Sequence, residues 1–325
     1  MSVKCRFNCL AVIGCLVFSP PSYATEVLFI HSYHLDYPWV KEYRQGFMDT
    51  IEQSDIIEHQ MDTKRIASSD FNQAADKAIQ QIQTSEPKLV VLADDNALKL
   101  VGPVVVQKQI PLVFLGINDN PRQYIALSKN VSGALERPLL KRSVSSLKTL
   151  LPTTKKILVM MDDNPTSYAI LATSFDNKLK QTIAGIKVDT LLFSRFLDWQ
   201  TAIEQSKANG YDAVIIANYA ALKDTNDNNV SLDSVSQWTS EHTPIPLFAF
   251  WDYSIGHDKA IGGLTINGYQ QGVVAAQHVN HFFSAGSLPS ISTPNRGELV
   301  YSQQQLQKWH ITLPSTLESR AKIVP

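Results

Sequence analysis

Cysteine is almost absent from this sequence. The chain has three cysteines, Cys5, Cys9 and Cys15, and all of them lie within its first two dozen residues. Without that segment the chain contains no cysteine, which excludes disulfide bonds, thiolate metal sites and cysteine nucleophiles. This composition suits an oxidising compartment, where a free thiol is a liability.

The sequence also lacks an excess of either charge, and it lacks long apolar runs. The chain has 29 Lys+Arg against 30 Asp+Glu, and no stretch of it is strongly basic. Nucleic acid is therefore not expected as a partner. Beyond the first two dozen residues, no apolar run approaches the roughly 20 residues that a membrane-spanning helix needs. We expect no membrane insertion of that part of the chain.

The common enzyme motifs are also missing. The sequence contains no G-x-S-x-G, no phosphate loop ending in G-K-[ST], no G-x-G-x-x-G and no H-E-x-x-H. His31 and His34 lie three apart near a strand end, where that spacing does not place both rings on one face. The carboxylates of Asp94 and Asp95 are adjacent and point apart, which disfavours paired acid–base work. We expect no enzyme, no bound metal and no cofactor.

The first residues resemble a secretory signal peptide. Lys4 and Arg6 precede an apolar run over residues 9–18, and Ser22-Tyr23-Ala24 has the small-x-small pattern of a cleavage site. We therefore expect residues 1–24 to be removed and the protein to be periplasmic. An alternative is lipid attachment at Cys15, because residues 12–15 resemble a lipobox.

Short apolar runs alternate with amphipathic helical patterns along the rest of the chain. This alternation predicts an α/β fold with parallel sheets covered on both faces. The pattern divides into two similar sets, and residues 90–98 align with residues 214–222. We predict two doubly wound parallel-sheet lobes. The expected strands are 27–30, 56–65, 89–93, 112–115 and 131–135 in the first set, and 157–161, 188–193, 213–217 and 247–250 in the second.

Polar and aromatic residues follow these strands at the edge where open parallel sheets bind ligands. They combine rings for stacking with amides and carboxylates for hydrogen bonds. Asp and Asn at such positions also serve as helix caps, an alternative that applies to Asp70, Asn164 and Asn267. The candidate ligand-binding residues are Ser32, Tyr33, Tyr37, Trp39, Asp94, Asp95, Asn96, Asn118, Asp119, Asp163, Asn164, Tyr168, Asn218, Tyr219, Trp251, Asp252 and Tyr253.

Several motifs resemble those of the ABC transporter substrate-binding proteins that include tryptophan and tyrosine binders. They are IHSYH at 30–34, YPW at 37–39, ADDNA at 93–97, PLVFLGIND at 111–119 and GYQQG at 268–272. The resemblance implies a type I periplasmic-binding fold, with two lobes joined by a multi-strand hinge. It implies a first lobe of residues 25–136 with part of 265–300, and a second lobe of 137–264 with part of 300–325.

The resemblance also implies a function. We expect a solute-binding protein that captures a small polar or aromatic molecule between its lobes and presents it to an ABC permease. The alternative is a sensory protein that reports ligand to a membrane kinase or cyclase. A secreted hydrolase is a more distant alternative.

The signal-peptide interpretation predicts the N-terminus of the exported protein. Cleavage after Ala24 leaves Thr25 as the first residue, which N-terminal sequencing would detect. A chain that begins instead at a lipid-modified Cys15 would support the anchored alternative.

Overall fold

The computed structural model describes residues 26–294 and 297–325. The predicted signal peptide, residues 1–24, and the alternative lipid site at Cys15 lie outside the described residues. Among the residues described, no helix is both long and apolar enough to cross a membrane.

The first lobe is built on a sheet of five parallel strands in the order β2-β1-β3-β4-β5. Side chains alternate between its two faces, so one core lies against α1 and α9 and another against α2, α3 and α4. Because both faces of the sheet are buried, its strands consist of continuous apolar runs in the sequence. The elements are β1 Val27–His31, α1 Pro38–Thr50, β2 Ile56–Gln60, α2 Phe71–Ser85, β3 Leu89–Ala93, α3 Asp94–Leu100, α4 Gly102–Gln107, β4 Leu112–Ile117, β5 Val131–Leu135 and α9 Gly268–Ala285.

The second lobe holds an eight-stranded sheet in the order β13-β12-β11-β10-β9-β6-β8-β7. Its centre is parallel, whereas β7 pairs antiparallel with β8 and β12 antiparallel with β11. The elements are α5 Leu140–Leu150, β6 Lys156–Asp162, α6 Pro165–Ser174, β7 Lys180–Ile183, β8 Ile186–Phe193, α7 Phe196–Glu204, β9 Ala213–Ile216, α8 Leu232–His242, β10 Leu247–Ala249, β11 Gly262–Thr265, β12 Glu298–Ser302, α10 Gln303–Lys308, α11 Ser315–Glu318 and β13 Ala321–Val324.

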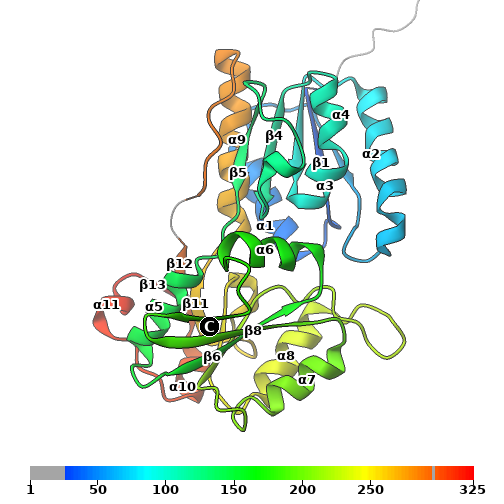
Figure 1. Ribbon diagram of the computed structural model, residues 1–325. Coiled ribbons are helices and arrows are strands. Elements are labelled where there is room, and N and C mark those ends of the chain that lie inside the picture. Colours follow the sequence, from blue (N-terminus) through cyan, green and yellow to red (C-terminus); the bar gives the residue numbers. More distant parts are fainter. Residues whose placement is uncertain (1–25, 295–296) are drawn as a thin grey trace, which may run out of the picture.

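The chain passes between the two sheets three times, after β5, after β11 and after α9. Figure 1 shows the sheets one above the other, with α9 running along the upper lobe and α6 at the junction. The predicted α/β class with two wound, parallel-sheet lobes is confirmed. The antiparallel strands β7 and β12 are additions that the apolar pattern did not predict.

Two local predictions were wrong. The strand expected over residues 56–65 ends at Gln60, because Asp62 adopts a left-handed conformation (φ 60°) and the amide of Thr63 bonds to the carbonyl of Ser32. Asp70 makes no side-chain capping bond. In contrast, Asn164 accepts from the amide of Thr166 and caps α6. Asn267 caps α9 in the same way.

Helices α1 and α9 cross at very short range on the outer face of the first sheet. Gly272 makes this approach possible: a Cβ atom built there would lie 1.8 Å from the backbone oxygen of Tyr43. The long returning helix α9 is thereby held against α1, which carries residues of the interlobe cleft at its N-terminal end.

Gly272→Ala should therefore lower the free energy of unfolding by about 1–3 kcal/mol, because the two helices must move apart. Chemical denaturation measures this change. The matched control is Gly256→Ala, where a Cβ meets nothing within 4 Å. Equal stability of the two variants would contradict the close-packing account.

Candidate functional site

The carboxyl ends of the central strands of both sheets face each other across a narrow cleft. The space that remains between the lobes amounts to about 10 Å³, roughly enough for one water molecule. Its lining comes from both lobes and from the first crossover. The lining residues are Tyr33, Tyr37, Trp39, Lys64, Asp94, Asn118, Glu136, Thr166, Asn218, Trp251 and Tyr253.

Asp94 follows β3 directly and is 2% exposed. Its backbone has φ +67°, a conformation that non-glycine residues seldom adopt outside functional sites and turns. One carboxylate oxygen, Oδ1, accepts from the indole Nε1 of Trp39 at 2.9 Å. The other, Oδ2, has no hydrogen-bond partner among the described residues. Burial, together with the charge of Glu136, raises the pKa of Asp94 well above its ordinary value.

Asn118 lies in the loop after β4. Its Nδ2 donates to Oε2 of Glu136 at 2.8 Å, whereas its Oδ1 is buried without a partner in the described part of the chain. Asp95 stabilises this loop. Its two carboxylate oxygens accept hydrogen bonds from the backbone amides of Asn118 and Asp119, both at 3.0 Å. Asp95 thus positions Asn118 and has its own oxygens occupied.

Three buried polar atoms in this cleft have no partner within residues 26–294 and 297–325. They are Oδ2 of Asp94, Oδ1 of Asn118 and Nδ2 of Asn218, which comes from the loop after β9. Buried polar groups in native proteins are almost always hydrogen-bonded, so each exception needs a reason. Three of them around one cavity provide a set of hydrogen-bonding positions for a small polar molecule.

Side chains from the two lobes contact each other around these atoms. The Tyr33 hydroxyl lies 3.1 Å from Oγ1 of Thr166, and the hydroxyls of Tyr37 and Tyr253 are 3.5 Å apart. The indole Nε1 of Trp251 donates to Oε1 of Glu136 at 3.0 Å. The structure is therefore a closed one, and no molecule larger than water fits unless the lobes separate or side chains move.

The remaining predicted site residues are placed differently. Ser32 bonds the carbonyl of Ala93, Asn96 bonds Thr63, and Tyr219 bonds Ser254. Their side chains join elements within a lobe. The carboxylates of Asp119 and Asp252 accept hydrogen bonds from residues close to them in the sequence. The side chains outside the cavity lining are Ser32, Asp95, Asn96, Asp119, Asp163, Asn164, Tyr168, Tyr219 and Asp252.

Three residues that line the cleft were not predicted from the sequence. Lys64 enters the cleft only because the chain turns at Asp62 after β2. Glu136 belongs to the first crossover, and Thr166 to the first turn of α6. Only Glu136 had a signal in the sequence, because its carboxylate directly follows the strand expected over residues 131–135. Among the described residues, no group of three metal-binding side chains is arranged to hold an ion.

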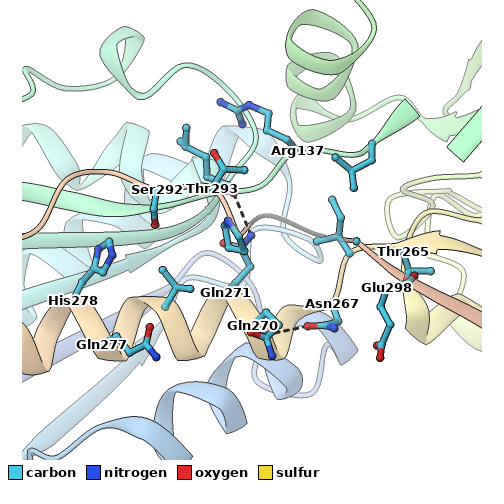
Figure 2. A pocket seen from close by; sticks show the side chains of 16 residues that line it. Arg137, Thr265, Asn267, Gln270, Gln271, Gln277, His278, Ser292, Thr293 and Glu298 are labelled. Carbon is cyan, nitrogen blue, oxygen red and sulfur yellow. Dashed lines mark hydrogen bonds between the residues drawn. The ribbon is translucent and has the colours of Figure 1, made fainter. Parts of the chain in front are cut away.

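A larger hollow lies at the crossovers beside α9, as Figure 2 shows. Its volume is about 480 Å³, and Arg137, Gln271 and His278 are among its lining residues. Residues 292–294 and Gly297 also line it. All of its described polar groups that are buried have hydrogen-bond partners, in contrast to those of the cleft.

A family model described as ABC transporter substrate binding protein matches residues 32–324. The chain belongs to this family. A search of curated protein sequences finds no match. The family is one of substrate-binding proteins.

Solved structures agree on the fold. A Vibrio cholerae conserved domain protein is 19% identical, with TM-score 0.67, covering 93% of this chain and 100% of that one. A Streptococcus pneumoniae ABC domain in complex with L-Trp is 14% identical, with TM-score 0.65 and coverages of 92% and 100%. A ligand-free, open substrate-binding protein from Clostridium difficile is 16% identical, with TM-score 0.63 and coverages of 92% and 99%.

The raised pKa of the buried carboxyl of Glu136 leads us to expect that lobe closure depends on pH. Burial raises its pKa to about 8, although hydrogen bonds from Asn118 and Trp251 act in the opposite direction. In an open cleft the group is hydrated and its pKa returns toward the ordinary value. The closed state therefore holds the proton on Glu136 more tightly than the open state does. Low pH favours the closed state, and the free energy of closure becomes less favourable as pH rises from about 4.5 to about 8.

We expect the ligand-free protein to have a larger radius of gyration at about pH 8.5 than at about pH 5.5 in small-angle scattering. Glu136→Gln should weaken this dependence, and Asp94 should account for what remains. Glu241→Gln, at an exposed position on α8, is the control and should behave like the wild type. A radius that falls as pH rises would contradict the sign of this prediction.

Proposed function

We propose that this protein captures a small polar or aromatic molecule between its lobes and presents it to an ABC permease. The observation that carries the proposal is the set of three unpartnered polar atoms, on Asp94, Asn118 and Asn218, enclosed by aromatic rings from both lobes. Family membership supports binding without chemical change as the role of the cleft.

The arrangement of donors and acceptors favours a ligand with both kinds of group. Asp94 and Asn118 each offer an acceptor, and Asn218 offers an amide group from the opposite lobe. A ligand that bonds to all three connects the lobes. Micromolar affinity requires about −8 kcal/mol. A few buried hydrogen bonds to a charged group, at about 1.5–3 kcal/mol each, together with apolar contact, can supply this amount.

The aromatic rings add shape selectivity to these bonds. Tyr33, Tyr37 and Trp39 come from the first lobe, and Trp251 and Tyr253 from the second, and all five are largely buried. Rings on both sides of a cavity suit a flat or apolar body of a ligand. Closure by hinge motion would then create the surface that a permease recognises.

Asp94→Asn tests the proposed cleft. Asparagine tolerates the left-handed backbone and can keep the bond from Trp39, but it replaces the free acceptor Oδ2 with a donor. We expect ligand affinity to fall at least about tenfold, or about 1.4 kcal/mol, in calorimetry with a ligand found by a thermal-shift screen of amino acids, nucleosides, sugars and polyamines. The melting temperature should stay equal or rise.

Asp163→Asn is the matched control. Asp163 was predicted to bind ligand, but its carboxylate accepts from Ser194 at an exposed position, so its replacement should leave affinity unchanged. A loss of affinity in both variants, or in neither, would count against the cleft as the binding site.

The permease partner can be tested separately. A transporter encoded beside this protein, reconstituted in liposomes, should hydrolyse ATP faster when the ligand-loaded protein is added. Stimulation of a neighbouring sensor kinase or cyclase instead would favour the sensory alternative.

A further inference from the structure

The loop after β9 in the second lobe contacts the first lobe through the side chain of Asn229. Its Nδ2 donates a hydrogen bond to the backbone oxygen of Lys64. A carbonyl oxygen can only accept, so the amide nitrogen of Asn229 must be the atom that faces it. Lys64 lines the cavity of the cleft, whereas Asn229 does not. This bond therefore joins the two lobes without occupying a position that a ligand would take.

The first-lobe segment that offers this carbonyl is fixed to its own sheet. The amide and the hydroxyl of Thr63 both donate to the backbone oxygen of Ser32, at the end of β1. The side chain of Asn96, on α3, donates to the Thr63 hydroxyl at 2.8 Å. The carbonyl of Lys64 thus belongs to a rigid part of the rim and cannot follow the second lobe when that lobe moves away.

The loop that carries Asn229 is fixed to the second sheet in turn. The amide of Lys223 donates to the backbone oxygen of Ser194 after β8, and Arg195 forms an ion pair of 3.0 Å with Asp227. Figure 1 shows the loop after β9 and the loop before α2 on the side of the molecule away from α9. A small rotation about the crossovers moves this side furthest. Opening of the lobes must therefore break the bond.

A second bond between the lobes also lies outside the cavity. Oγ1 of Thr173, on α6, is 2.8 Å from the backbone oxygen of Asn118 and 2.8 Å from that of Ala169 in its own helix. One hydroxyl hydrogen serves both acceptors, so Thr173 keeps a partner within α6 when the lobes separate. Its bond to the first lobe therefore contributes less to closure than the bond from Asn229.

We propose that Asn229 is a clasp: its bond to the Lys64 carbonyl stabilises the closed state independently of any contact with ligand, and it thereby controls how often the cleft opens to solvent. The inference rests on the proposed function only in taking this cleft as the place where a ligand enters.

The size of the effect follows from the chemistry of the bond. A hydrogen bond between neutral groups changes such an equilibrium by about two- to tenfold. Oδ1 of Asn229 is buried without a partner among the described residues, which offsets part of this contribution. We therefore expect a change in the lower half of that range.

Pulsed electron–electron double resonance on spin-labelled, ligand-free protein measures the closed-to-open ratio. The chain after residue 24 contains no cysteine, so Asp76→Cys on α2 and Thr201→Cys on α7 give one label per lobe at exposed positions. Asn229→Ala and Asn229→Leu should each lower the ratio by about two- to fivefold. Leucine retains most of the side-chain volume, so agreement between the two variants excludes an effect of packing alone.

Matched controls separate the clasp from local effects. Asn226→Ala removes an exposed asparagine of the same loop and should match the wild type. Thr173→Val should lower the ratio less than Asn229→Ala does. Thr149→Val, which removes a hydroxyl that bonds to Ser145 within α5, should leave it unchanged. Identical distance distributions in the wild type and both Asn229 variants would overturn the inference, and so would a larger loss in Thr173→Val than in Asn229→Ala.

Quenching of tryptophan fluorescence by acrylamide gives a second readout of access to the cleft. Trp39 and Trp251 line the cavity and are 3% and 2% exposed, so acrylamide reaches them when the lobes open. Both Asn229 variants should raise the quenching constant, whereas Asn226→Ala should not. A constant equal to that of the wild type in both Asn229 variants would contradict the clasp. Neither readout needs a ligand: a thermal-shift screen that finds none would count against the proposed function, and these measurements would still decide the role of Asn229.

Discussion

The burial of two carboxylates between the lobes is the constraint on which the rest of this structure depends. Asp94 and Glu136 lie almost entirely out of contact with solvent, at 2% and 3% exposure. Such burial is unfavourable unless the charges are bonded, paired or neutralised. The indoles of Trp39 and Trp251 donate one hydrogen bond to each group. The Oδ2 atom of Asp94, which these bonds leave without a partner among the described residues, is the acceptor that we propose for the ligand.

The position of Glu136 connects this constraint with the hinge. The residue lies in the first crossover between the lobes, and it bonds to Asn118 in one lobe and Trp251 in the other. The adjacent Arg137 donates to four backbone oxygens, including those of Ile117 and Asn118. A change of angle at the crossover would therefore alter the loop that carries Asn118, one of the proposed ligand-binding residues. Closure and the geometry of the site are mechanically coupled.

The sequence alone predicted the parts of the site that depend on strand ends. Asp94, Asn118 and Asn218 follow buried apolar runs, and the carboxyl ends of parallel strands meet at one edge. The pattern did not separate the free Oδ2 of Asp94 from the fully bonded carboxylate of Asp95, since both residues share that strand end. Only the hydrogen bonds of the folded loop distinguish them.

Lys64 illustrates why the other residues that line the cleft could not be predicted from the sequence. Residues 56–65 read as one strand, and a lysine near the end of an edge strand is ordinarily exposed. The left-handed turn at Asp62 redirects the chain and carries Lys64 inward. Such a turn depends on tertiary hydrogen bonds, here between Thr63 and Ser32, and local propensity does not encode it. The close contact of α9 with α1 likewise follows from packing at Gly272, which no local sequence pattern indicates.

Native mass spectrometry of the protein purified without denaturation tests the central claim most directly. The account predicts a retained small molecule, one copy per chain, that is lost when the lobes are unfolded and rebinds to the refolded chain. Repeated preparations that carry no small molecule and acquire none from a cell extract would contradict it.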